Sequence, residues 1–148
     1  MKKLKRIGEG PGFTVMELIV VIAMAMLLMG IALPSFLSWL PTFRLSAAAR
    51  QVATDLQMAR MRAVAQNASN TVTFTPSNGT YTFTLGSDSR DLNGLYPGIT
   101  ISSVSVNPQF TPRGTANAVT IRLGNGSAEK WVCVKAVGRV SIQDSVCT

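Results

Sequence analysis

A long run without charge is the feature that most limits what this chain can fold into. From Leu18 to Leu33 every residue is apolar or glycine, and no charged side chain occurs between Glu17 and Arg44. About 20 apolar residues cross a bilayer as a helix at a rise of 1.5 Å per residue. The run therefore predicts one transmembrane helix near the N-terminus.

The charges before this run predict its orientation. Lys2, Lys3, Lys5 and Arg6 precede it, and basic flanks stay in the cytoplasm. A cleaved secretory signal peptide has a similar basic start, but it needs a small-x-small cleavage site after the apolar stretch, which residues 34–39 fit poorly. We therefore expect a single-pass anchor with the C-terminal bulk outside the cytoplasm.

The composition limits the chemical functions that this chain can have. The 148 residues suit one domain plus an anchor, and the formal charge of +7 includes +3 from residues 1–12. Because the sequence contains no histidine, it lacks the commonest general base and the usual zinc ligand. An exported enzyme is therefore disfavoured, and we expect no catalytic residue, metal site or cofactor. Asp88, Arg90 and Asp91 are typical of a solvated turn.

The two cysteines, Cys133 and Cys147, both lie in the C-terminal fifth of the chain. In an exported protein they predict one disulfide that closes a loop of about 15 residues and stabilises the fold by about 3 kcal/mol. Two unrelated reduced thiols are the alternative in a cytoplasmic protein.

Glu17 is an anomaly at the edge of the apolar run. A carboxylate in a membrane segment costs about 2.5–3.5 kcal/mol at the helix centre unless a partner neutralises it. The run contains no cation, but a cut between Gly12 and Phe13 would create an α-amine four residues before Glu17. A proton-relay role for Glu17 is the alternative.

Residues Gly12 to Leu18, after a basic leader and before an apolar helix, resemble the type IV prepilin cleavage signature. The resemblance implies that a bacterial prepilin peptidase and methyltransferase cuts after Gly12 and N-methylates Phe13. It also implies that Glu17 aids assembly through the N-terminal amine of a neighbouring pilin subunit. The chain would then lie in the inner membrane, with its head in the periplasm, before joining a filament.

Pro34 lies near the end of the apolar run, and Pro41 follows it. Proline removes one helical hydrogen bond and kinks or breaks a helix. Either Pro34 kinks the helix, as the pilin resemblance implies, or the helix ends there at the membrane surface.

A helical period resumes from Thr42 to about Ala68. Apolar residues spaced by four and three predict a helix with one buried stripe. The stripe comprises Leu45, Ala49, Val52, Leu56, Ala59 and Ala63.

The period then changes from 3.6 to 2, which predicts strands. Residues 71–75 and 80–85 flank an Asn-Gly turn and predict a hairpin, and residues 86–98 are expected to form a polar loop. Further strands are expected at residues 99–106, 118–123, 130–137 and 139–142. The predicted fold is α+β, a long N-terminal helix with a transmembrane half and an amphipathic half, packed on a C-terminal antiparallel β-meander. Its expected parts are a leader (residues 1–12), an assembly helix (13–41) and a head (42–148).

The tail resembles the GspH/FimT group of minor pilins and pseudopilins. The likeness lies in residues 110–114, 119–121, 131–134 and 138–140. It implies a minor subunit of a type IV pilus or of the type II secretion pseudopilus, whose partners are other pilin subunits.

DNA binding is a second hypothesis, because some FimT-group members bind DNA through a Gly-Arg-x-Arg motif. Here Gly138-Arg139-Val140-Ser141 keeps only the first arginine. A basic face for phosphates would consist of Arg122, Lys130, Lys135 and Arg139. The alternative, which we favour, is that these charges are solvated strand positions.

Overall fold

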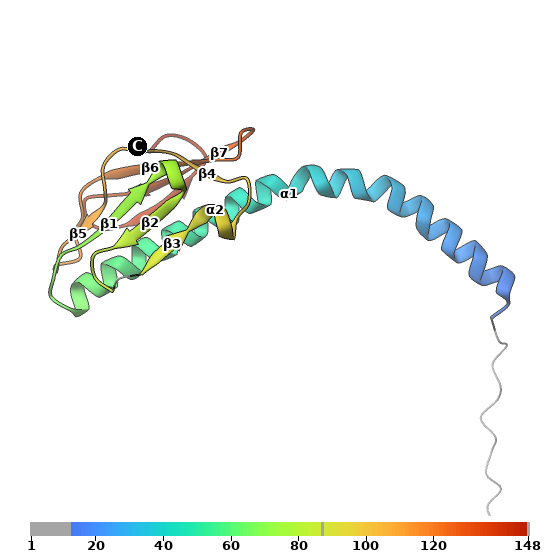
Figure 1. Cartoon of the computed structure of the whole chain (residues 1–148), viewed down its shortest axis with the longest axis horizontal. Coiled ribbons are helices and arrows are strands. Elements are labelled where there is room, and N and C mark those ends of the chain that lie inside the picture. The colour runs from blue at the N-terminus through green and yellow to red at the C-terminus, as the bar shows by residue number, and fades with distance from the viewer. Residues whose placement is uncertain (1–12, 87, 148) are drawn as a thin grey trace, which may run out of the picture. The chain divides into compact units, whose positions relative to one another are not determined.

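The computed structural model describes residues 13–86 and 88–147. The chain divides into two compact units, one up to Ser38 and one from Trp39 onward. One helix, α1 (Val15–Ala65), contributes to both (Figure 1). Each unit is described by itself.

The N-terminal unit is the first part of α1. The Thr14 hydroxyl accepts a hydrogen bond from the Glu17 backbone N–H at 3.2 Å and so caps the helix start. Residues Val15–Ala32 are long and apolar enough to cross a membrane, and none of this span is buried within the chain. The prediction of a membrane-length apolar helix is confirmed.

The helix does not end at Pro34 or Pro41, because α1 continues through both. The alternative of a helix end at the membrane surface is therefore wrong. The helical segment expected from Thr42 is, as predicted, the continuation of the same helix. A kink at Pro34 remains a prediction.

α1 ends at Ala65, three residues before the predicted end. Asn67 adopts a left-handed conformation with φ 48°, and the backbone N–H of Ala68 donates to the Ala63 carbonyl at 3.1 Å. The Asn67 N–H donates to the Val64 carbonyl at 3.3 Å. This pair of bonds is a Schellman cap with asparagine at its left-handed position, which satisfies carbonyls that the helix leaves open.

The predicted stripe on α1 is buried in the second unit, where the strands lie along this part of the helix (Figure 1). All six residues of the stripe, from Leu45 to Ala63, are at most 1 % exposed. Four of the six are alanine or valine, so the helix backbone approaches the sheets closely. The core includes Val72, Tyr81, Phe110 and Ile121 from the strands.

The first sheet has the strand order β3-β2-β1-β5. The predicted hairpin is confirmed: β1 (Asn70–Thr75) pairs antiparallel with β2 (Thr80–Phe83), with Thr75 opposite Thr80. A 3₁₀ turn, η1 (Pro76–Asn78), joins them and ends at Gly79 with φ 66°. Glycine adopts this left-handed conformation without strain.

The segment expected to be a polar loop contains structure. β3 (Ser89–Asp91) pairs with β2, and a one-turn helix, α2 (Leu92–Leu95), follows it. The Asp91 carboxylate accepts a hydrogen bond from the Gly94 N–H at 3.0 Å, and Leu92 is fully buried. The expectation was wrong because a three-residue edge strand of polar residues has no hydrophobic period.

The second sheet has the order β4-β6-β7-β8, all pairs antiparallel. Its strands are β4 (Thr100–Val104), β6 (Val119–Gly124), β7 (Glu129–Val134) and β8 (Val140–Gln143). Between β4 and β6 the chain forms β5 (Gln109–Phe110), which pairs with β1 in the first sheet. In β5, Phe110 lies opposite Asn70 and is fully buried. The predicted antiparallel α+β fold is confirmed, and its strands are divided between two sheets because β5 pairs with β1.

Candidate assembly and binding sites

The N-terminal site begins at the edge of the described structure. Gly12 and the leader lie outside the described residues, and Phe13 is exposed. Glu17 lies in the first turn of α1, where the helix dipole favours a negative charge. Its carboxylate has no cationic partner among the residues that the structure describes.

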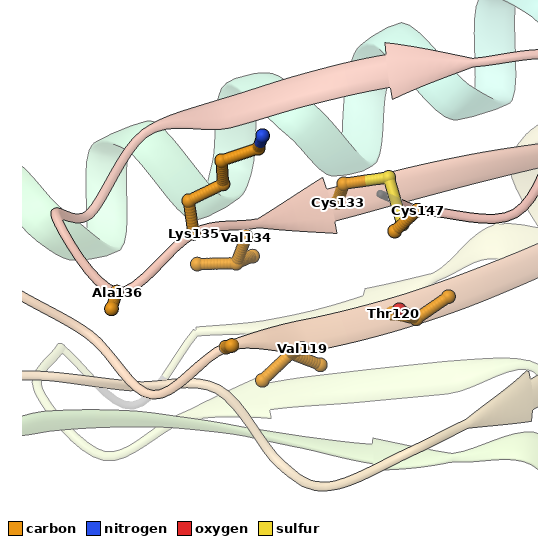
Figure 2. Close-up of a pocket in the computed structure, with 8 residues that line it drawn as sticks. Val119, Thr120, Cys133, Val134, Lys135, Ala136 and Cys147 are labelled. Carbon is orange, nitrogen blue, oxygen red and sulfur yellow. A yellow bond between two sulfur atoms is a disulfide. The ribbon is translucent and has the colours of Figure 1, made fainter.

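The disulfide between Cys133 and Cys147 is present, with the two Cα atoms 5.7 Å apart. Cys133 is in β7, and the chain after β8 folds back to place Cys147 against it (Figure 2). The bond therefore closes a loop that contains the edge strand β8. A shallow cavity of about 370 Å³ beside it is lined by Thr120, Lys135 and the disulfide itself (Figure 2).

Two of the four candidate DNA contacts are already paired with acids. Arg122 bonds to Glu129 and lies over the Trp131 ring, its guanidinium carbon 6.0 Å from the ring centroid. The bond to Glu129 raises the pKa of Arg122 further above its usual range. Lys130 bonds to Asp144. Because Arg122 and Lys130 are paired with acids, little of their charge is available to bind phosphates.

Strand register separates these cations further. Arg122 lies opposite Trp131, so the two side chains share one face of the sheet. Successive side chains alternate across a strand, so Lys130 points to the other face. The structure does not bring all four cations onto one face.

Lys135 and Arg139 remain together at the turn between β7 and β8. The Lys135 N–H donates to the Arg139 carbonyl at 2.9 Å, and the Gly138 N–H donates to the Lys135 carbonyl at 2.7 Å. Both side chains are exposed and have no carboxylate partner among the described residues. Together they form the accessible part of the predicted basic surface.

This turn packs on the segment around Gly114. Arg60 Nε of α1 donates to the Gly114 carbonyl at 2.8 Å. A Cβ added to Gly138, at φ 77°, would lie 1.9 Å from that carbonyl oxygen. We call this contact the glycine junction (Arg60, Gly114, Gly138). It explains physically why the two segments that carried the family likeness, 110–114 and 138–140, contain glycine.

A buried polar cluster surrounds Asp55 of α1 and was not predicted from the sequence. Asp55 is 1 % exposed. The Tyr81 hydroxyl donates to its carboxylate at 2.6 Å, Gln51 Nε2 donates at 3.1 Å, and Arg90 Nε lies 3.7 Å away. Burial, with the bond to Asp55, raises the pKa of Tyr81 well above its usual range. In the sequence, this cluster was indicated by an acidic residue, Asp55, beside the apolar stripe.

The residues expected to form a solvated turn take part in specific contacts. Arg90 reaches the Asp55 cluster, and Asp88 pairs with Arg62 at 2.7 Å. Asp91 caps α2. Within the described part of the chain, no group of three or more acidic or cysteine side chains could hold a metal ion. The polar contacts here join the helix to the first sheet.

The model of the family "Type II transport protein GspH" matches residues 48–138. The chain belongs to the GspH family. No curated protein sequence matches the chain. The GspH-family segment includes the helix stripe from Ala49 onward, both sheets as far as the β7–β8 turn, and the glycine junction.

Two solved structures show the same fold. The type IV minor pilin FimU of Pseudomonas aeruginosa is 18 % identical, with a TM-score of 0.55, over 67 % of this chain and 92 % of FimU. The minor pseudopilin EpsH from the Type 2 Secretion System of Vibrio cholerae is 10 % identical, with a TM-score of 0.57, over 68 % of this chain and 97 % of EpsH. The α+β pilin fold is confirmed, and family and fold are those of structural pilins.

Proposed function

We propose that this GspH-family protein is a minor filament subunit that is made as a precursor and cut between Gly12 and Phe13 by a prepilin peptidase. The same enzyme then methylates the new amine of Phe13. The mature chain stays in the inner membrane through α1, with the head in the periplasm, until it enters a type IV pilus or a type II secretion pseudopilus.

The observation that carries this proposal is the apolar first part of α1, none of which is buried against the described residues. Residues Val15–Ala32 present apolar side chains with no covering element. A helix that is hydrophobic on all sides needs lipid or other helices around it. A filament subunit meets both, lipid before assembly and the helices of other subunits afterward.

Glu17 gives the second support. Its carboxylate lacks a cation in the described part of its own chain, and an unpaired charge in an apolar setting is strongly unfavourable. The cut after Gly12 would give every subunit a cationic N-terminus. Pairing of Glu17 with the amine of a neighbouring subunit would make the ion pair available only in the assembled filament.

The test measures incorporation into sheared filaments in cells that express the whole assembly system. Wild type is compared with Glu17→Gln, and Glu129→Gln serves as a matched control because it removes a half-buried carboxylate from the head. We expect Glu17→Gln to remain in the membrane and Glu129→Gln to be incorporated normally. Normal incorporation of Glu17→Gln would refute the assembly role.

DNA binding is the second candidate function, on a smaller surface than the sequence suggested. Lys135 and Arg139 flank the glycine junction, next to Arg60 and Arg113, and Arg60 and Arg139 line one groove. None of the four has a carboxylate partner among the described residues. Clustered free cations favour phosphate contacts that weaken with salt.

Binding of the full chain in detergent to double-stranded DNA at rising salt tests this candidate. We expect Lys135→Gln with Arg139→Gln to weaken binding and reduce its salt dependence, while Arg122→Gln changes little. Equal loss in both variants, or binding insensitive to salt, would argue against this surface.

A further inference from the structure

An exposed aromatic pair lies on α1 shortly after the membrane-length span. Trp39 and Phe43 are 62 % and 56 % exposed, and their ring centroids are 5.9 Å apart. With Thr42, Ser46, Ala47 and Arg50 they line a shallow groove on the surface of the second unit. Two large aromatic side chains left this exposed in a protein with a well-packed core indicate an interaction surface.

The charges beside this pair are positive only. Arg44 follows Phe43, and Arg50 lines the same groove as the two rings. The sequence has no acidic residue between Glu17 and Asp55, and Asp55 is buried in its own cluster. Neither arginine has a carboxylate partner in the described structure. The surface therefore suits an anionic partner with an apolar side.

The position along the helix indicates which partner. Trp39 lies seven residues after Ala32, the end of the apolar span, in one continuous helix. From Val15 to Trp39 the helix axis is about 36 Å long at 1.5 Å per residue. The hydrocarbon core of a bilayer is about 30 Å thick, and the headgroup layer begins beyond it. Trp39 thus falls in the layer where tryptophan side chains are enriched in membrane proteins.

We propose that Trp39, Phe43, Arg44 and Arg50 form an interfacial collar that binds the phospholipid headgroup layer on the outer side of the membrane. The aromatic rings lie in the headgroup layer, and the guanidinium groups contact the phosphates from its outer side. The collar sets the depth of the subunit in the bilayer before assembly. It rests on membrane anchoring through α1, and it goes beyond the pilin family assignment.

The test uses the full chain reconstituted in phospholipid vesicles. The sequence contains two tryptophans, so Trp131→Phe leaves Trp39 as the single emitter. Lipids brominated near the headgroup or near the acyl-chain end then report its depth. We expect strong quenching by the headgroup-side probe and weak quenching by the deep probe. The reverse order, or no quenching by either probe, overturns the proposal.

Two controls distinguish the collar from simple anchoring and from self-association. In Trp39→Phe the remaining Trp131, which is in β7 of the head, should not be quenched by either probe. Flotation of the chain with the vesicles measures membrane anchoring separately. A chain that floats but whose Trp39 is not quenched would contradict the collar and leave the anchoring through α1 intact. If a second copy covers Trp39, quenching is lost and emission depends on the protein-to-lipid ratio, which also overturns the proposal.

The arginines are tested with vesicles that contain phosphatidylglycerol or only phosphatidylcholine. In wild type we expect the Trp39 emission to shift further to the blue with the anionic lipid. Arg44→Gln with Arg50→Gln should lose this dependence. The matched control, Arg122→Gln with Lys130→Gln, removes two cations of the head that are already paired with acids and should keep it. Equal loss in both double variants contradicts a local role of the collar.

Discussion

The two parts of α1 show how one helix can serve two environments. From Val15 to Ala32 none of the helix is buried, and Leu27 is 69 % exposed. From Trp39 onward one face is buried, as in Leu56, which is 1 % exposed. The first part needs an environment that the chain does not supply, whereas the second finds its partners in the two sheets of the same chain.

The carboxylates of α1 repeat this contrast. Asp55 has Tyr81, Gln51 and Arg90 within its own unit. Glu17 has no cation in the described part of the chain. A buried charge is tolerated only with a partner. Folding therefore satisfies Asp55, and we propose that assembly satisfies Glu17.

The largest expected effect comes from core truncation. Leu56→Ala should lower the free energy of unfolding of the head by about 2–5 kcal/mol, because it leaves a cavity beneath the sheets. Leu27→Ala removes the same atoms from the exposed span and should leave the unfolding of the head unchanged. Urea denaturation of the full chain in detergent, followed by Trp131 fluorescence in a Trp39→Phe background, measures both. Equal losses of unfolding free energy in the two variants would contradict the difference between the two parts of α1.

Loss of the disulfide should have the next largest effect, again confined to the head. Cys133→Ala with Cys147→Ser should lower stability by about 3 kcal/mol, the chain-entropy expectation for a loop of this length. Val146→Ala, beside Cys147 and 63 % exposed, is the matched control and should change little. A double cysteine variant as stable as wild type would mean that the closed loop does not support β8.

Asp55→Asn should destabilise the head by about 1–3 kcal/mol, because Arg90 loses its charge partner and the hydrogen bond from Tyr81 weakens. Glu17→Gln should leave the unfolding free energy unchanged, since the Glu17 carboxylate has no ion pair among the described residues. Both are measured by the same denaturation curves. A stability loss in Glu17→Gln would refute the division of roles between the two carboxylates.

The smallest effect appears only at alkaline pH. The pKa of Tyr81 is raised by folding, so stability is fully present below the ordinary tyrosine value of 10.0 and falls as pH rises above it. The loss is at most about 1.4 kcal/mol per pH unit for one group. Tyr81→Phe should flatten this slope, whereas Tyr96→Phe should keep it. An unchanged slope in Tyr81→Phe would mean that Tyr81 is not the titrating group.

Local patterns explain which parts of the fold were predictable from sequence. The stripe from Leu45 to Ala63 and the hairpin around Gly79 depend on spacing and turn chemistry within short segments. β5 has two residues and β3 three, and both exist through pairing with strands distant in the chain. Phe110 and Asn70 are brought together by the fold alone, so no period in the sequence marks them.

The candidate sites divide in the same way. The cysteine pair could be predicted because only two cysteines exist. The basic face could not be judged from sequence, because the partners of Arg122 and Lys130 depend on strand register and on the path after β8. The Asp55 cluster requires Tyr81 and Arg90 to meet the helix, which only the packing of β2 and β3 shows.

Intact-mass analysis of the purified membrane-fraction protein, from cells with and without the prepilin peptidase, tests the central claim most directly. The account predicts a chain that begins at Phe13 and is heavier by one methyl group when the peptidase is present, and the uncut chain when it is absent. A chain that still begins at Met1 in the presence of the peptidase, or one that begins after Ser38, would contradict it.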